Sequence, residues 1–421
     1  MREPSAGGLQ GARQRGLSGR LRSAKRWLGL IAAGALAWPA AAPAAAPAPP
    51  EIPARAWVLL DAGDAARLAA AHPDDSYPMA STTKLMTAYL ALRELPLDKR
   101  LVAPAYHPIP GESLLGLEAG ERISVRDLLY GLLLPSGNDA AATLAEGAAG
   151  STSAFVAQMN RAAARLGLRH TSYANPIGLD QPSNYSSPDD LAALALRLRR
   201  ERIFRRIVDT PRTTLHSGAH PRTIVNHNDL IGRVPWMNGV KTGYTPDAGY
   251  VLVGSGTRKG VTLLSVVMGA PSIRARDGDT LALLRYGFSL YRRRTAITSG
   301  ETLAHARVAN GERGLALVAD RPVRATLRRG QRADVTVVVP RSLEAPVRRG
   351  ERLGHAVVTV EDEVVGRAPL RARYSVPVAS NSLLARADDA LPGPRALVWC
   401  LAAAVVAALG IGLLVARRRP G

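Results

Sequence analysis

The spacing of apolar and polar residues divides residues 51–290 into helical and strand segments. Residues 85–95 and 139–149 have a helix-forming composition. Three short apolar or β-branched runs lie close to glycines, as buried strands do. These runs are residues 57–60, 250–254 and 261–268. Because strands stand at both ends of the segment with helices between them, we predict an antiparallel sheet in which the first and last strands pair.

The pattern changes at residue 292. From there to residue 378, short β-rich runs alternate with turn clusters, and strong helix signals are absent. The runs are residues 316–318, 335–339 and 356–360. We therefore predict a mixed helix-and-strand domain over residues 47–291, a small all-β domain over residues 292–378, and a linker over residues 379–395.

Both ends of the chain carry apolar segments typical of membrane export. Residues 1–46 combine an Arg-rich start, an apolar run at 27–38 and an Ala/Pro stretch, which indicates a signal peptide, with an uncleaved anchor as the alternative. Residues 396–416 carry no charge and as a helix would reach about 31 Å, enough to cross a bilayer. The positive-inside rule places the basic tail at 417–421 in the cytoplasm. We therefore expect an exported protein held on the outer face of the cytoplasmic membrane.

Composition narrows the classes of function. The formal net charge is +21, but the excess gathers at the two ends and in the β-rich region, and aromatic residues do not alternate with basic ones. We therefore expect no nucleic-acid partner and assign the charge to an anionic envelope surface. The single cysteine, Cys400, excludes an internal disulfide and a cysteine-based metal site.

One of the few lysines follows a serine by three positions. Only five of the 55 basic residues are lysines, and a lysine, unlike an arginine, can lose its proton when buried. Ser81 and Lys84 open an apolar helix, so their side chains share one face. A serine needs a base to become a nucleophile, and Lys84 is placed to serve if its pKa falls. Read alone, Ser81 is an ordinary helix cap.

Two further short motifs follow in the first domain. A Ser-Gly-Asn turn at 136–138 separates the apolar run at 128–134 from the second predicted helix. A Lys-Thr-Gly segment at 241–243 precedes the strand at 250–254. Each motif alone is an ordinary turn or strand segment. Their occurrence in this order, together with the Ser81 motif in one exported chain, indicates a nucleophilic-serine site.

These three motifs resemble the S-x-x-K, S-x-N and K-T-G set of penicillin-binding proteins and serine β-lactamases. Within that group the chain is similar to the low-molecular-mass D-alanyl-D-alanine carboxypeptidases over residues 51–416. Segments outside the motifs also match, at 120–125, 134–140, 175–180, 239–245 and 261–270. Two departures are Asn238, where relatives commonly have Asp, and residues 396–416, where relatives often have an amphipathic helix.

The resemblance implies a fold and a chemistry. The fold is an α+β catalytic domain, with an antiparallel sheet covered by helices on both faces and a helical subdomain, then a small all-β domain and a C-terminal transmembrane helix. Ser81 is expected to attack the penultimate D-Ala of a peptidoglycan pentapeptide stem, with Lys84 as general base and Ser136 as proton relay. The resemblance implies that the substrate is bound by Asn138, Lys241, Thr242, Gly243, Tyr244 and Arg276. Arg274 is a near alternative to Arg276.

The resemblance further implies that β-lactams acylate Ser81 and that no metal or cofactor is needed. Two related activities stay open. An endopeptidase that cuts crosslinked peptidoglycan uses similar residues, and the sequence separates it poorly. A serine β-lactamase shares the motifs, but the β domain, the anchor and the lack of a clear deacylating Glu argue against it. An idle scaffold is disfavoured because the motif residues are intact, and we interpret the β domain as a spacer in preference to a docking surface.

Overall fold

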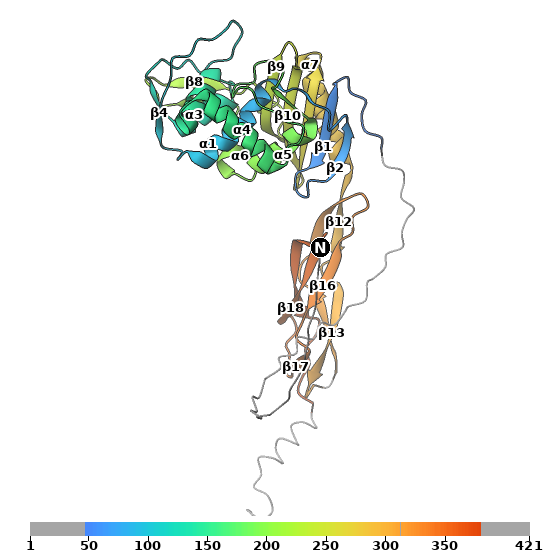
Figure 1. Ribbon diagram of the computed structural model, residues 1–421. Helices are drawn as coiled ribbons and strands as arrows, with labels where there is room; N and C mark the ends of the chain where they lie inside the picture. The colour runs from blue at the N-terminus through green and yellow to red at the C-terminus, as the bar shows by residue number, and fades with distance from the viewer. Residues whose placement is uncertain (1–46, 312, 380–421) are drawn as a thin grey trace, which may run out of the picture. The chain divides into compact units, whose positions relative to one another are not determined.

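The computed structural model describes residues 47–311 and 313–379. The expected signal peptide at 1–46, most of the linker and the expected span at 396–416 lie outside the described residues. Among the described residues, no helix is both long and apolar enough to cross a membrane. The described chain contains a mixed α/β domain followed by an all-β domain (Figure 1).

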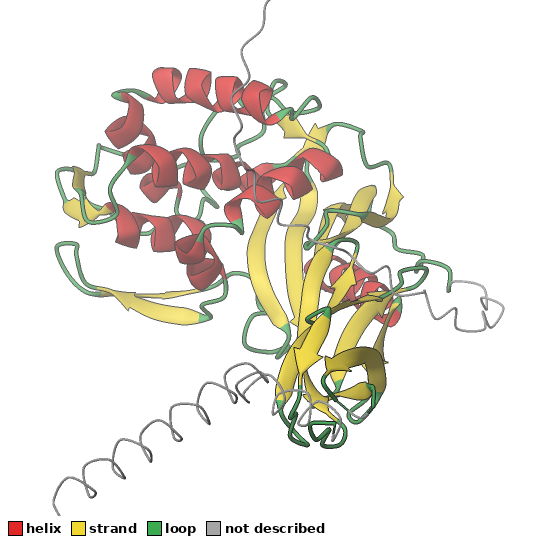
Figure 2. Cartoon of the chain, turned by 90° about the horizontal axis from the view of Figure 1, so that it is seen from below, coloured by secondary structure: helices red, strands yellow, loops and turns green. Residues whose placement is uncertain are grey.

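A five-stranded antiparallel sheet forms the centre of the first domain (Figure 2). Its strands are β1 (Ala56–Asp61), β2 (Arg67–Ala71), β9 (Met237–Thr245), β10 (Gly249–Arg258) and β11 (Val261–Ala270). They lie in the order β2-β1-β11-β10-β9. Because β1 pairs with β11, with Val58 opposite Val266, the predicted pairing of the first and last strands is confirmed.

Seven helices are described in the first domain. They are α1 (Lys84–Glu94), α2 (Val125–Leu133), α3 (Asn138–Ala149), α4 (Thr152–Leu166), α5 (Pro188–Leu198), α6 (Arg202–Val208) and α7 (Ile273–Ser289). The predicted helices at 85–95 and 139–149 are α1 and α3. Side-chain caps define where several of these helices begin. Ser124, for example, accepts the backbone N–H of Asp127 at the start of α2.

Both faces of the sheet are covered by helices. Alternate residues of β1 enter different clusters: Val58 and Leu60 pack in the cluster that includes α5, and Trp57 and Leu59 pack in the cluster that includes α7. Successive strand residues face opposite sides, so α5 and α7 cover opposite faces. Burial on both faces explains why these strands are continuous apolar runs in the sequence.

Helices α1 to α4 and α6 share one hydrophobic cluster with the α5 face of the sheet. Short two-stranded pairs join this helical region. They are β3 (Tyr77–Pro78) with β6 (Tyr185–Ser186), β4 (Arg100–Val102) with β5 (Arg122–Ser124), and β7 (Arg212–Leu215) with β8 (Arg222–Val225). The predicted α+β catalytic domain with a helical subdomain is therefore present.

The all-β domain has a separate apolar core. Strands β12 (Tyr291–Ile297) and β15 (Val323–Arg328) pair with each other. A six-stranded sheet has the order β16-β18-β19-β14-β13-β17. Its strands are β13 (Thr302–Ala309), β14 (Leu315–Ala319), β16 (Asp334–Val338), β17 (Ser342–Glu344), β18 (Arg352–Val360) and β19 (Glu363–Ala372). Leu317, Val358 and Leu370 are among the residues of its core.

Candidate active site

Ser81 and Lys84 lie where a short 3₁₀ turn leads into a helix. The turn is η1 (Ala80–Thr83), and α1 begins at Lys84. Ser81 and Lys84 therefore open one continuous helical segment, as predicted, with Ser81 in its 3₁₀ turn and Lys84 as the first residue of α1. Residues three apart eclipse each other in a 3₁₀ turn, so the side chains stay aligned. The Nζ of Lys84 lies 3.2 Å from the Oγ of Ser81.

The side-chain amine of Lys84 is fully buried and faces three oxygen atoms. Besides Ser81 Oγ, these are Asn138 Oδ1 and the carbonyl oxygen of Ile177, each at 2.6 Å. The two carbonyl oxygens can only accept, so each takes an N–H of the amine. In a neutral amine the remaining position is a lone pair, which then faces the Ser81 hydroxyl. This arrangement suits removal of the serine proton.

The surroundings of Lys84 favour this neutral form. Burial lowers the pKa of Lys84 well below its ordinary value of 10.5, and the charge of Lys241 lowers it further. Glu112 and Asp139 act in the opposite direction. Burial, with a smaller effect from Arg276, also lowers the pKa of Lys241, to about 7. The site therefore holds two lysines whose protonation changes far below the usual range.

Strand β9 carries the Lys-Thr-Gly motif against the turn that bears Ser81. A Cβ on Gly243 would lie 3.0 Å from the backbone nitrogen of Ser81, tighter than most Cβ contacts, so the lack of a side chain favours this close approach. Lys241 is 1% exposed, and its Nζ donates to the carbonyl oxygen of Thr242 at 2.8 Å. Tyr244 is 54% exposed and its ring stacks on Tyr250 with centroids 4.4 Å apart.

The Ser-Gly-Asn turn lies between α2 and α3. Ser136 has a φ of +67°, a left-handed conformation that is unusual for serine and is often found at functional sites. Its Oγ is buried and has no hydrogen-bond partner among the described residues. Asn138 contacts Lys84 directly, whereas no hydrogen bond joins Ser136 to either lysine. The proton relay through Ser136 therefore stays a prediction.

Arg276 lies in the first turn of α7, near Lys241. It is 5% exposed, and its guanidinium pairs with the carboxylate of Asp277, with Nε 2.9 Å from Oδ1. Its charge contributes to the lowered pKa of Lys241. Arg274 is exposed. Of the two arginines considered from the sequence, Arg276 is therefore the one that the structure places within the field of the site.

The carbonyl of Ile177 is a contact that sequence reasoning missed. Its loop lies against the serine turn, since a Cβ on Gly178 would come within 2.2 Å of the carbonyl oxygen of Ala80. Gly178 also has a φ of +98°. The 175–180 segment resembles the family pattern, but a backbone oxygen carries no side-chain signature that a motif could reveal.

Glu112 is a second contact that was missed. It lies in the loop between β4 and β5, and its Oε2 accepts a hydrogen bond from the amide nitrogen of Asn138 at 2.7 Å. The hydroxyl of Tyr106 donates to the same oxygen. Glu112 is separated from Asn138 by 26 positions, so no local spacing in the sequence could have linked them.

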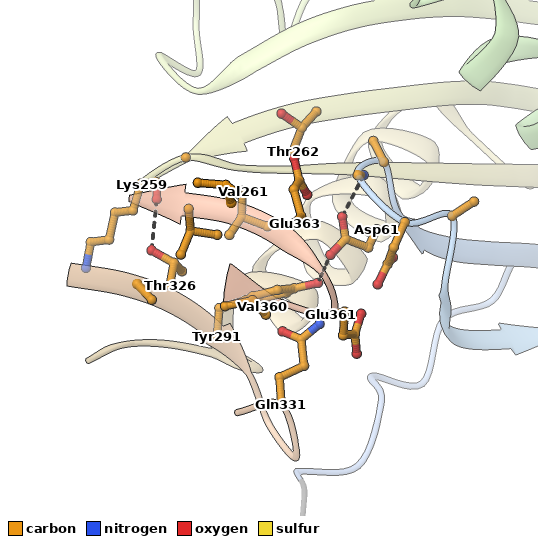
Figure 3. Close-up of a pocket in the computed structure, with 18 of the residues that line it drawn as sticks. Asp61, Lys259, Val261, Thr262, Tyr291, Thr326, Gln331, Val360, Glu361 and Glu363 are labelled. Carbon is orange, nitrogen blue, oxygen red and sulfur yellow. Dashed lines mark hydrogen bonds between the residues drawn. The ribbon is translucent and has the colours of Figure 1, made fainter. Parts of the chain in front are cut away.

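A cavity of about 730 Å³ lies apart from this cluster (Figure 3). In it the hydroxyl of Tyr291 points to Asp61, and Thr326 donates to the carbonyl oxygen of Lys259 at 3.3 Å. None of the site residues inferred from the sequence lines this cavity. Over residues 47–311 and 313–379, no group of three or more His, Cys, Asp or Glu side chains could hold a metal ion.

Comparisons with known proteins agree with this geometry. Residues 43–272 match the family model described as D-alanyl-D-alanine carboxypeptidase. Residues 291–378 match the model for the C-terminal domain of penicillin-binding protein 5. The first match covers the sheet, the helical region and all three motifs, and the second covers the all-β domain.

Individual relatives match about 70% or more of the chain. The D-alanyl-D-alanine carboxypeptidase DacF of Bacillus subtilis is 30% identical, over 70% of this chain and 78% of its own. DacC of Escherichia coli, with the same activity, is 32% identical over 69% of this chain and 76% of its own. The solved structure of penicillin-binding protein 5 from Haemophilus influenzae aligns with a TM-score of 0.56 and 29% identity, covering 78% of this chain and 99% of that one.

The buried serine–lysine pair, the two further motifs around it and the family matches over both domains lead to one conclusion. The chain belongs to the D-alanyl-D-alanine carboxypeptidase family and is a serine peptidase of the penicillin-binding type.

Proposed function

We propose that this enzyme removes the terminal D-Ala of peptidoglycan pentapeptide stems through an acyl-enzyme on Ser81, with Lys84 as the base. The observation that carries the proposal is the contact pattern of the Lys84 amine. Two carbonyl oxygens take its N–H groups, and its third direction faces Ser81 Oγ at 3.2 Å. The lowered pKa of Lys84 supplies the neutral amine that proton removal needs.

The substrate carboxylate is assigned to Lys241, Thr242 and Arg276. The pKa of Lys241 is lowered to about 7 by burial and by Arg276, and a bound carboxylate would favour its protonated form. Substrate binding and the charge on Lys241 therefore support each other. Requirement for a free terminal carboxylate is what distinguishes a carboxypeptidase from an enzyme that cuts within a chain.

The remaining steps are assigned to the motif residues by the same scheme. The backbone N–H groups of Ser81 and Tyr244 form the oxyanion hole, where one donor is typically worth about 3 kcal/mol. Gly243 supports this assignment because it lets β9 approach the Ser81 nitrogen. Ser136 passes a proton to the leaving D-Ala amine, Asn138 positions the substrate amide, and water activated by Lys84 releases the acyl group.

Two measurements test this scheme. The purified protein, incubated with a D-Ala-D-Ala-ended pentapeptide, should release one D-Ala per stem, and a fluorescent penicillin should label it covalently. Ser81→Ala should abolish both while leaving the thermal unfolding midpoint unchanged. Labelling that persists in Ser81→Ala would remove Ser81 from the mechanism.

We further propose that residues 396–416 anchor the enzyme on the outer face of the bacterial cytoplasmic membrane. The support is the uncharged 21-residue run followed by arginines, together with the export signal expected at 1–46. The full chain should stay with membranes after a carbonate wash, and a chain ending at residue 379 should not. Recovery of the full chain in the soluble fraction would contradict the anchor.

A further inference from the structure

The Asn138 side chain lies between two groups of different hydrogen-bonding character. Its Oδ1 faces the Lys84 amine at 2.6 Å, and its Nδ2 faces Glu112 Oε2 at 2.7 Å. A neutral lysine amine can both donate and accept, so Lys84 alone does not decide which way round the amide lies. A carboxylate can only accept. Glu112 therefore requires the amide nitrogen on its own side, and the planar amide then turns its oxygen to Lys84.

We propose that Glu112 is a positioning residue for acyl transfer: its carboxylate fixes the amide of Asn138 so that the oxygen faces Lys84 and one N–H remains for the substrate. The inference rests on the proposed function and adds a residue to it. An amide nitrogen carries two N–H groups. One donates to Glu112, and we assign the other to the carbonyl of a bound stem peptide.

Glu112 is itself held in place by donors. The hydroxyl of Tyr106 donates to Oε2, and the backbone N–H of Ile109 donates to Oε1 at 3.1 Å. Burial alone would raise the pKa of Glu112, but the hydrogen bonds from Asn138, Tyr106 and Ile109, with the charge of Lys84, outweigh it and lower the pKa. Glu112 is therefore ionised at neutral pH, as an acceptor-only group must be.

The loop that carries Glu112 has separate attachments to α3. The backbone N–H of Asn138 donates to the carbonyl oxygen of Ser113 at 2.8 Å. The carboxylate of Asp139 accepts backbone N–H groups of three successive loop residues at 2.7 to 2.9 Å, namely Leu115, Gly116 and Leu117. The loop should therefore keep its position when the Glu112 side chain is changed, which makes the proposal testable by substitution.

The test compares acylation by a fluorescent penicillin in full-length wild type, Glu112→Ala, Asn138→Ala and the double variant. It is run at a pH where the wild-type rate no longer rises, so that Lys84 is neutral in every protein. Glu112→Ala should lower the acylation rate about ten- to a hundredfold, as misplaced catalytic groups do. In the Asn138→Ala background the same change should lower it less than about threefold, because residues acting through one another are not additive.

A second variant adds a pH readout. Glu112→Gln keeps an acceptor for Asn138 but removes a negative charge that raises the pKa of Lys84. The other charges that act on Lys84 stay in place: Lys241 lowers its pKa and Asp139 raises it. The acid limb of the acylation profile should therefore move to lower pH, and the plateau rate should stay within about threefold of wild type. Tyr106→Phe, which removes one donor to Glu112, should have a smaller effect of the same kind as Glu112→Ala.

Controls separate this inference from the proposed function. Glu118→Ala removes an exposed carboxylate of the same loop and should leave the rate and the thermal midpoint unchanged. If the fluorescent penicillin did not label the wild-type protein, the proposed function itself would be contradicted. With a labelled wild type, a Glu112→Ala rate equal to wild type, an equal loss in both backgrounds, or an unmoved acid limb in Glu112→Gln would overturn the role of Glu112.

Discussion

The two domains differ in what they bury. The first domain buries charged side chains, including Lys84, Lys241, Arg222 and Glu121. In the β domain, by contrast, every residue described as buried is apolar. Burying a charge is unfavourable unless partners compensate for it. The β domain shows that an apolar core alone suffices to keep a domain folded, so each buried charge of the first domain calls for an explanation of its own.

The first domain also buries charge in two different ways. Arg222 and Glu121 neutralise each other, with Nη1 2.6 Å from Oε1 and both side chains almost fully buried. Lys84 instead faces only uncharged oxygens within hydrogen-bond distance. Pairing keeps an ion pair charged and inert, whereas burial without a paired anion lowers a lysine's pKa and makes it a base. The comparison separates a structural buried charge from a reactive one.

Removing the reactive lysine should have the largest effect on activity. Lys84→Ala should lower the rate of acylation by a fluorescent penicillin about a thousandfold, the scale typical of a general base. The fold should persist, because the substitution removes no ion pair. Labelling kinetics and circular dichroism on the same sample check this expectation. Labelling at the wild-type rate would show that another group deprotonates Ser81.

Breaking the structural pair should lower the stability of the protein and leave its acylation rate unchanged. Arg222→Ala leaves Glu121 buried without its partner, and loss of one member of a buried pair typically costs about 3–5 kcal/mol of unfolding free energy. The protein that remains folded should acylate at the wild-type rate. Urea unfolding, with labelling rates corrected for the folded fraction, measures both quantities. A slowed rate in the folded fraction would mean that the pair also supports the site.

A core substitution in the β domain should destabilise that domain alone. Leu370 is fully buried in β19, and truncating a buried leucine to alanine typically removes about 2–5 kcal/mol. Val364 lies on the same strand at 48% exposure, and Val364→Ala should change stability by about 0.5 kcal/mol or less. Neither change should alter acylation. If Leu370→Ala slowed labelling of the folded protein, the two domains would be coupled.

The sequence predicted the parts of the fold that have strong periodicity. The run at 261–268 is apolar except at Thr262 and Ser265, and it corresponds to β11 (Val261–Ala270) within two residues at each end. Pairs such as β3 and β6 consist of two residues each. So short a strand has no measurable period, and its pairing depends on contacts between segments distant in the chain.

The site divides in the same way. Ser81 and Lys84 could be inferred together because three positions along a turn bring their side chains side by side. Glu112 could not be inferred, because its contact with Asn138 depends on how the 103–121 loop folds back on α3. Nor could the carbonyl of Ile177, because any residue supplies a backbone oxygen. The motifs specify the reacting residues, and the tertiary fold brings in the groups that hold those residues in place.

The pH dependence of the unfolding free energy also distinguishes the buried, titrating Lys84 from the apolar core of the β domain. Lys84 has a folded-state pKa well below its ordinary 10.5. Between those two values the unfolded chain binds a proton that the folded chain lacks. Stability therefore rises with pH in that window, by at most about 1.4 kcal/mol per unit for this one group. Below the folded-state pKa both states bind the proton, and the contribution to the slope disappears.

Lys84→Met removes this titration while filling a similar volume. The difference in unfolding free energy between wild type and Lys84→Met should therefore change with pH between about pH 8 and pH 10, in favour of the wild type as pH rises. In the folded protein Lys241 changes its charge near pH 7 and is coupled to Lys84, so the comparison is made above that range. Leu370→Ala changes no titrating group, so it should lower the unfolding free energy by the same amount at every pH in this window. A constant difference between wild type and Lys84→Met would mean that Lys84 keeps its proton in the folded enzyme, and the base would have to be sought elsewhere.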